Sequence, residues 1–179
     1  MKNEKIIVVD LEATCWRENL PEQRKNSEII EIGICLLDTK SGEITKNEGI
    51  LIKPDHSEVS EFCEELTTIS QRMIDEKGIS LKLAIDRLKN EYNSEHLVWA
   101  SYGAYDLNMF KRQCKSKNID YPFGSDHLNV KEVFKKSLGI KKNVGMKKAL
   151  NILKIKLEGT HHRGVDDARN IAKILYKCL

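Results

Sequence analysis

Apolar residues follow two different patterns along the chain, and these patterns predict the order of its elements. A continuous β-branched run at 6–9 and a second apolar run at 29–37 are typical of buried strands, and the apolar positions within 42–54 indicate a third strand. Three strands in succession predict a meander. The apolar residues of 81–92 recur instead at helical spacing, which predicts an amphipathic helix, and 97–100 is a short fourth strand.

The second half of the chain is predicted to be mostly helical. Apolar spacing and the glycines that interrupt it indicate helices at 107–114, 129–138 and 146–153, and a last helix at about 165–178. Strands first, then strands alternating with helices, are typical of an α/β fold in which helices cover a mixed sheet. Periodicity by itself does not choose between the three-layer folds of this kind.

Length and composition predict one soluble domain, residues 1–179. A chain of 179 residues with 40% hydrophobic content can bury one substantial core. No stretch reaches the roughly 18 apolar residues that a membrane crossing needs, and the start leads directly into the first strand, so we expect a cytoplasmic protein without membrane association. Its five cysteines lack C-x-x-C spacing, which favours reduced thiols over a zinc site.

Positive charge is unevenly distributed along the chain. The net charge of +3 is too small to indicate a nucleic-acid partner, but within 131–156 nine lysines accompany a single acid, Glu132. Such a run is either a set of solvated helix faces or a surface that faces phosphates. The sequence leaves both interpretations open.

Two acids stand at the end of the first predicted strand. Asp10 and Glu12 are two residues apart, so their carboxylates point to the same side of the strand and repel each other. A third acid, Asp106, follows the strand at 97–100 and opens the next helix. Each position also has an ordinary explanation, which is a strand end meeting solvent for the pair and a helix N-cap for Asp106.

A fourth acid lies where an apolar residue is expected. Asp167 shares a helix stripe with three residues that should face the core, namely Ile171, Ile174 and Cys178. A buried carboxylate needs a cation, a metal or hydrogen bonds. Its neighbour Asp166 falls on another face, where it complements the helix dipole.

A histidine precedes this last helix. His162 lies five residues before Asp167 and ahead of Gly164, which places an imidazole over the carboxylates. A second histidine, His161, stands beside it and makes the choice between the two less secure. Each residue alone has an ordinary structural explanation, and only the joint pattern of four acids and one histidine indicates a functional site.

Phosphodiester hydrolysis would use this set of groups. The attacking water and the leaving 3′ oxygen both need their charge stabilised, which two divalent ions about 3.5 to 4 Å apart can do. The four carboxylates suit Mg²⁺ or Mn²⁺ better than zinc. His162, which titrates near neutral pH, would then be the general base and not a metal ligand. The predicted metal ligands are Asp10, Glu12, Asp106 and Asp167.

The order of these residues resembles the DEDDh group of DnaQ-like exonucleases, whose name gives the four acids and the histidine of an H-x4-D motif. The similarity runs from 8–15 through 28–33 and Asp106 to 162–172, so it covers nearly the whole chain. The resemblance implies a ribonuclease H-like three-layer fold with a mixed five-stranded sheet flanked by helices. It also implies two Mg²⁺ or Mn²⁺ ions per site and 3′→5′ exonuclease activity.

Three short motifs are most similar to the eukaryotic-type RNA exonucleases that process histone-mRNA hairpins, ribosomal RNA and small interfering RNA. They are Asp-x-Glu-Ala-Thr-Cys at 10–15, Phe-Cys ahead of Leu-Thr within 62–67, and Gly-x-Asp-Asp-x-x-Asn-Ile-Ala at 164–172. This similarity implies RNA as the leading substrate.

The resemblance also implies which residues contact the substrate. Those around the terminal nucleotide are Ala13, Thr14, Leu66 and Thr67. Base stacking adds Tyr102, Tyr105 and Trp16 as candidates, with core packing as the alternative for each aromatic side chain. Where the branch usually has glycine, this chain has Thr68, which permits close backbone approach less readily and leaves the nucleotide contacts open.

The sequence thus predicts a metal-dependent exonuclease that releases nucleoside 5′-monophosphates from a free 3′ end, with RNA favoured and single-stranded DNA as a second candidate. A hypothesis from a different class is a regulatory module of the same fold that binds nucleic acid or a protein partner without cutting. The intact set of five residues argues against it. A third hypothesis, an unrelated α/β protein with a coincidental pattern, conflicts with the core-facing position of Asp167.

Overall fold

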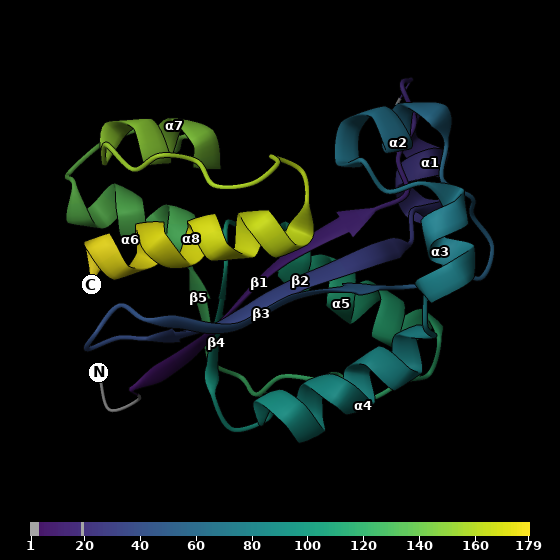
Figure 1. Ribbon diagram of the computed structural model, residues 1–179, viewed down its shortest axis with the longest axis horizontal. Helices are drawn as coiled ribbons and strands as arrows, with labels where there is room; N and C mark the ends of the chain where they lie inside the picture. Colours follow the sequence, from purple (N-terminus) through teal and green to yellow (C-terminus); the bar gives the residue numbers. More distant parts are fainter. Residues whose placement is uncertain (1–3, 19) are drawn as a thin grey trace.

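The computed structural model describes residues 4–18 and 20–179 and places five strands in one mixed sheet (Figure 1). The strands lie in the order β3-β2-β1-β4-β5. β2 pairs antiparallel with β1 and β3, β4 runs parallel to β1, and β5 runs parallel to β4. The bounds are Lys5–Ala13 (β1), Ile29–Asp38 (β2), Ile44–Leu51 (β3), Val98–Ser101 (β4) and His127–Asn129 (β5). Both the meander and the mixed five-stranded sheet are confirmed.

Five helices lie where apolar spacing predicts them. They are α4 (Leu81–Tyr92), α5 (Tyr105–Ser116), α6 (Val130–Ser137), α7 (Met146–Ile152) and α8 (Gly164–Cys178). Three short helices were not predicted, because they are too short to show an apolar stripe; they are α1 (Pro21–Asn26), α2 (Glu61–Thr67) and α3 (Gln71–Lys77). Among the described residues, no helix has the length and apolar character needed to cross a membrane.

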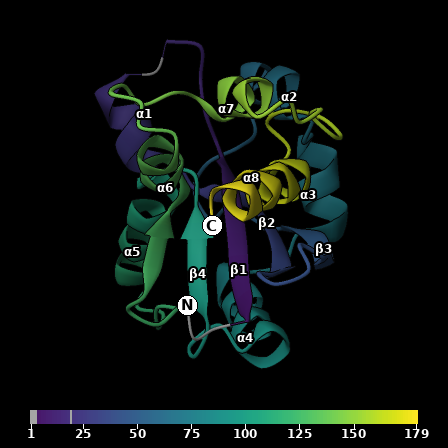
Figure 2. The same ribbon diagram turned by 90° about the vertical axis from the view of Figure 1, so that its left-hand side faces the viewer.

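β1 is apolar on both sides because helices cover both faces of the sheet. Ile7 and Val9 pack into the core that includes α4 and α5, whereas Ile6 and Val8 pack into the core that includes α6, α7 and α8. The two views agree, since α4 and α5 lie on one side of the sheet and α8 lies on the other (Figures 1 and 2). A strand that is buried on both faces reads as an uninterrupted apolar run, as the sequence showed.

The start of α8 packs tightly on β2. A Cβ atom added to Gly33 of β2 would lie 1.8 Å from the carbonyl carbon of Gly164, so only glycine fits there. Glu31, two residues earlier in β2, accepts a hydrogen bond from the Gly164 amide at 2.7 Å and another from the Arg163 guanidinium at 3.1 Å. These contacts fix the first turn of α8 beside the polar end of β1.

Candidate active site

The polar end of β1 borders a cavity of about 320 Å³. The cavity is lined by Asp10, Leu11, Glu12, Ala13, Cys15, Leu66, Tyr102, Tyr105, Asp106, Met146, His161, His162 and Asp167. All five residues of the predicted catalytic set are among them. The structure therefore brings together groups that lie up to 157 residues apart, from position 10 to position 167.

Three of the carboxylates converge closely. One oxygen each from Asp10, Glu12 and Asp167 lies within 4.8 Å of the other two. Glu12 and Asp167 are almost fully buried, with 8% and 4% of their surface exposed. Asp10 and Glu12 share one side of β1, as strand periodicity predicts.

The fourth carboxylate does not serve as a helix cap. Ala104 is the N-cap residue of α5 and makes no side-chain cap hydrogen bond, so the N-cap explanation of Asp106 is wrong. The Oδ1 atom of Asp106 instead accepts a hydrogen bond from the backbone amide of Leu11, at 3.0 Å. Leu11 lies between the two acids of β1, so this bond joins the start of α5 to the acidic end of the strand.

Asp167 is held from one side and left without a partner on the other. Its Oδ2 atom accepts a hydrogen bond from the backbone amide of His162 at 2.9 Å and lies 3.0 Å from Nδ1 of His161. Its buried Oδ1 atom finds no hydrogen-bond partner among the described residues. Asp166 lies elsewhere, as expected, and accepts a hydrogen bond from the backbone amide of Thr160 at 2.8 Å.

Burial and mutual repulsion raise the pKa values of these acids. The pKa of Asp10 is raised well above its usual range, first by burial and then by the charges of Asp106 and Glu12. Burial, followed by the charge of Asp167, raises the pKa of Glu12 to about 9. Burial raises the pKa of Asp106 to about 6, although its hydrogen bond from Leu11 acts in the opposite direction. In the folded chain without a cation, the ionised forms of these carboxyls are therefore disfavoured.

Both histidines line the cavity, and their rings stack with centroids 3.9 Å apart. The ring of His161 contacts Asp167, whereas His162 contacts the same carboxylate through its backbone amide. His162 has a positive φ of 66°, which turns the chain into the first turn of α8. Burial and the neighbouring His161 lower the pKa of His162, which favours the neutral imidazole.

Comparison with known proteins agrees with this geometry. The exonuclease family (RNase_T) matches residues 7–175. The chain belongs to this family. It is 28% identical over 198 residues to ERI1 exoribonuclease 2 of Homo sapiens, covering 97% of this chain and 28% of that protein. It is 30% identical over 183 residues to 3′-5′ exoribonuclease 1 of Homo sapiens, covering 97% of this chain and 52% of that protein.

A solved structure extends the likeness to three dimensions. The nuclease domain of 3′hExo, a DEDDh family member bound to rAMP, is similar with a TM-score of 0.87 and 27% identity, covering 98% of this chain and 92% of that one. These matches confirm the DEDDh resemblance and the ribonuclease H-like fold. The chain spans about a quarter to a half of the length of the two human relatives.

The acidic cluster of this exonuclease domain fits divalent cations. Its candidate ligand atoms are carboxylate oxygens, which hard cations such as Mg²⁺ and Mn²⁺ prefer. The buried Oδ1 atom of Asp167 makes no hydrogen bond to the described residues, so its lone pairs are available to coordinate a cation. Divalent charge would also offset the repulsion that raises the pKa values of Asp10 and Glu12. The residues that could hold such ions are Asp10, Glu12, Asp106 and Asp167.

Four of the seven residues expected to contact substrate line the acidic cavity, and Trp16 lies outside it. The four are Ala13, Leu66, Tyr102 and Tyr105. Two large apolar side chains among them remain exposed, Tyr105 at 57% and Leu66 at 36%. Exposed apolar surface beside a polar cavity is typical of a binding site rather than of core packing.

The two threonines of the expected set do not line the acidic cavity, although Thr14 lines the cavity next to it. Thr67 is fully buried, and its hydroxyl donates to the Cys63 carbonyl at 2.8 Å. Thr14 is 1% exposed, and its hydroxyl accepts a hydrogen bond from the Glu28 amide at 2.9 Å. Both hydroxyls thus make hydrogen bonds within the fold. Thr68, the departure from the usual glycine, has a φ of 60° at the end of α2, a conformation that glycine adopts without strain.

The lysine run contributes one residue beside the cavity. Lys131 places its Nζ atom 5.4 Å from the ring centroid of Tyr102. Seven of the nine lysines have exposed side chains, and Lys135 pairs with Glu132 at 2.5 Å. The run is thus largely a solvated surface that begins next to the candidate active site.

Proposed function

We propose that this chain is a 3′→5′ exonuclease that favours RNA and releases nucleoside 5′-monophosphates from a free 3′ end. The observation that carries the proposal is the convergence of Asp10, Glu12, Asp106 and Asp167, with His162, around one cavity. The names of the two human relatives, both exoribonucleases, and the rAMP bound to 3′hExo support RNA as the favoured substrate. Single-stranded DNA is the second candidate.

The four carboxylates are proposed to hold two divalent ions, either Mg²⁺ or Mn²⁺. When bound, such ions supply the charge that stabilises both the attacking and the leaving oxygen. The chain itself sets the positions of the ligands. The Leu11 amide orients Asp106, and the His161 ring and His162 amide orient Asp167, leaving its Oδ1 atom free.

His162 is the proposed general base. Its lowered pKa leaves the imidazole neutral near pH 7, so a ring nitrogen can accept the proton of the attacking water. His161 is proposed to be a positioning residue, because its ring already contacts the Asp167 carboxylate. The bond that breaks joins the last phosphorus atom to the 3′ oxygen of the preceding nucleotide, and the phosphate stays on the released nucleotide.

The terminal nucleotide is proposed to lie between α2 and α5. Ala13 and Leu66 would contact its base and sugar, while the rings of Tyr102 and Tyr105 stack on nucleotides near the end. Thr14 and Thr67 would act indirectly, through their hydrogen bonds to Glu28 and Cys63. The lysines of α6 and α7 would attract the phosphate backbone.

We further propose that residues 1–179 act as one catalytic domain in the cytoplasm. The family match over 7–175 supports one domain. All five cysteines are free, which suits a reducing compartment.

A gel time course on 5′-labelled single-stranded RNA and DNA of matched sequence tests the proposal. Wild-type protein and Asp10→Asn are compared with Mg²⁺, with Mn²⁺ and with chelator. We expect a metal-dependent ladder that shortens from the 3′ end, faster on RNA and absent in the variant. Uncut substrate that still shifts on a native gel would instead favour a binding module of the same fold without nuclease activity.

A further inference from the structure

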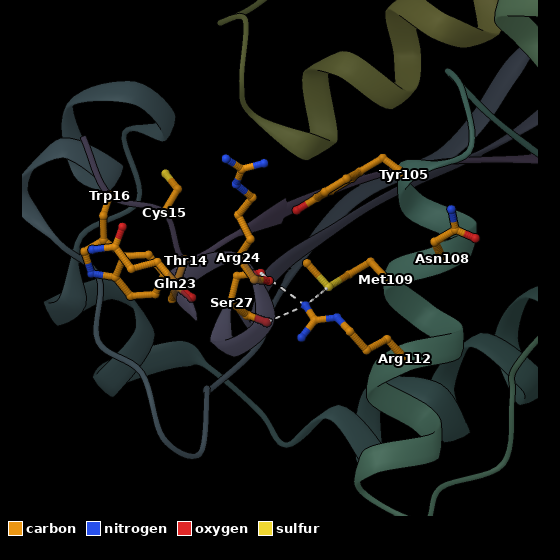
Figure 3. Close-up of a pocket in the computed structure, with 10 residues that line it drawn as sticks. All are labelled: Thr14, Cys15, Trp16, Gln23, Arg24, Ser27, Tyr105, Asn108, Met109 and Arg112. Atoms are coloured by element: carbon orange, nitrogen blue, oxygen red, sulfur yellow. Dashed lines mark hydrogen bonds between the residues drawn. The ribbon is translucent and has the colours of Figure 1, made fainter. Parts of the chain in front are cut away.

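A second cavity adjoins the acidic one and contains none of the clustered acids. It has a volume of about 370 Å³ and lies between α1 and α5 (Figure 3). This volume falls within the range of about 300 to 1,000 Å³ that is usual for small-molecule sites. Cys15 and Tyr105 line both cavities, so the two are neighbours that share a wall.

The walls of the second cavity suit a flat aromatic ring. Trp16 lies on one side and Tyr105 with Met109 on the other, as Figure 3 shows. Stacking on aromatic side chains is the usual way in which proteins bind unpaired bases, because every base has a π face. Polar edges are available too, since the exposed Asn108 amide makes no side-chain hydrogen bond within the part of the chain that the structure describes.

The chain holds Trp16 in place from both sides. The carbonyl of Cys15 accepts a hydrogen bond from the Ser60 hydroxyl at 2.6 Å. On the other side of Trp16, Arg17 pairs with Glu65 of α2 at 3.0 Å and lies over the Phe62 ring. The segment that carries the indole is therefore tied to α2.

The opposite wall is also fixed before any ligand binds. Arg112 of α5 donates hydrogen bonds to the carbonyls of Lys25 and Ser27, the latter at 2.6 Å, and lies 2.7 Å from the sulfur of Met109. These contacts join the end of α1 to α5 (Figure 3). Arg24, also in this wall, adds a guanidinium group that attracts phosphate.

We propose that this second cavity binds the base of the nucleotide next to the 3′ end, between Trp16 and Tyr105. The inference rests on the proposed function, because it takes the terminal nucleotide to occupy the acidic cavity. Tyr105 stands in the shared wall, so it separates the terminal base from the one before it. The domain would thus recognise two nucleotides and orient the bond between them for hydrolysis.

Abasic RNA tests the proposal directly. One 5′-labelled strand lacks the base next to the 3′ end, and a matched strand lacks a base far inside the sequence. We expect wild-type protein to release the first nucleotide from the first strand with a kcat/KM about 5- to 150-fold lower than from the second, the range that corresponds to loss of one stacked base. Trp16→Ala should be slower on the matched strand and should no longer distinguish the two.

Controls separate base recognition from folding. Trp16→Phe keeps an aromatic ring and should restore most of the discrimination. Tyr176→Ala removes an aromatic ring that lines neither cavity and should behave like wild type. Thermal melts of each variant identify any loss of fold.

Binding in chelator separates this inference from the proposed function. Fluorescence anisotropy measures the Kd of each of the two strands in chelator. The strand that lacks the base next to the 3′ end should bind about 5- to 150-fold more weakly than the matched strand, whether or not the protein cuts. Equal affinity of wild type for both strands, or full discrimination by a folded Trp16→Ala, would overturn the role of the cavity while leaving the nuclease intact. Absence of hydrolysis with intact discrimination would refute the nuclease and keep the cavity.

Discussion

The backbone of Gly33 in β2 lies directly against the backbone of Gly164 in the first turn of α8. A Cβ atom at Gly33 would lie 1.8 Å from the Gly164 carbonyl carbon and 2.4 Å from the Val165 amide nitrogen. Both neighbours are backbone atoms, which cannot rotate away as a side chain could. The position of Asp167, one turn further along α8, therefore depends on the absence of a side chain in β2.

Gly33→Ala is expected to destabilise the protein by at least about 2 kcal/mol, because α8 must shift to admit the methyl group. Displacement of Asp167 should also reduce hydrolysis more than the loss of stability explains. Denaturant titration and single-turnover kinetics at a temperature where the variant is folded would measure the two effects. Gly145→Ala is the matched control, since nothing lies within 4 Å of its added Cβ; we expect a change below about 1 kcal/mol.

Asp10→Asn should make the metal-free protein more stable and the metal-bound protein inactive. The pKa of Asp10 is raised in the folded state, so its contribution to stability is present at low pH and is lost as the pH rises. Ionisation of Asp10 therefore opposes folding, and the asparagine removes that charge. Each kcal/mol gained on removing that charge would raise the Tm by about 2 to 4 °C.

The same variant separates metal binding from folding. In wild type, Mg²⁺ at a hundred times its Kd should add about 2.7 kcal/mol of stability, and chelator should reverse this. Asp10→Asn should lose most of that gain, whereas Asp120→Asn, at an exposed acid, should keep it. Equal stabilisation of all three proteins by Mg²⁺ would contradict the proposed ligand set.

Replacing either of the two adjacent histidines with alanine should lower activity, but only one of the two losses should be partly restored by high metal concentration. His162→Ala removes the proposed base and is expected to lower kcat by about 10²- to 10⁴-fold at any metal concentration. His161→Ala removes the ring that contacts Asp167, so we expect about a 10- to 100-fold loss that high Mn²⁺ partly restores. Metal titrations of both variants measure this. The reverse ranking would assign the base to His161.

Glu28 should make stability depend on pH in the acid range. Its carboxylate accepts hydrogen bonds from the backbone amides of Asp55, His56 and Ser57 and from Lys117. Burial raises the pKa of Glu28, but the hydrogen bonds outweigh it and lower the pKa to about 2. The ionised Glu28 carboxylate therefore stabilises the folded protein at pH values above about 4.3, the pKa of glutamate in unfolded chains. This stabilisation is lost as the pH falls towards 2.

Glu28→Gln should therefore cost on the order of 2 to 3 kcal/mol at pH 7 and much less at pH 2.5. Urea titrations at both pH values measure the difference. Glu22→Gln, at an exposed acid of α1, is the control and should change stability little at either pH. A penalty for Glu28→Gln that stays constant with pH would mean that shape, and not charge, matters there.

Hydrophobic periodicity was sufficient to predict the long elements. α8 is long enough to show its helical period, β1 shows the uninterrupted apolar run of a strand buried on both faces, and both lie at the predicted positions. β5 has only three residues and α1 six, so neither shows a period, and tertiary contacts decide their conformation. The order of the acids along the chain similarly predicted the composition of the cavity.

Contacts between distant residues could not be predicted in this way. The bond from the Leu11 amide to Asp106 joins residues 95 positions apart, and no local pattern distinguishes it from an N-cap. The buried Glu31 did leave a signal, as an acid within an apolar strand, but its partner Arg163 lies 132 positions away. Which of the two adjacent histidines contacts Asp167 through its ring depends on a left-handed turn that the sequence does not specify.

The docking of α8 also determines when the domain can act. Asp10, Glu12 and Asp106 come from the first 106 residues, whereas Asp167 comes from the last helix of the fold. Under the proposed mechanism, a partly folded domain in which α8 has not docked holds three of the four ligands and cannot cut RNA. Nuclease activity would begin only when α8 closes against Gly33, so that cleavage depends on completion of the fold.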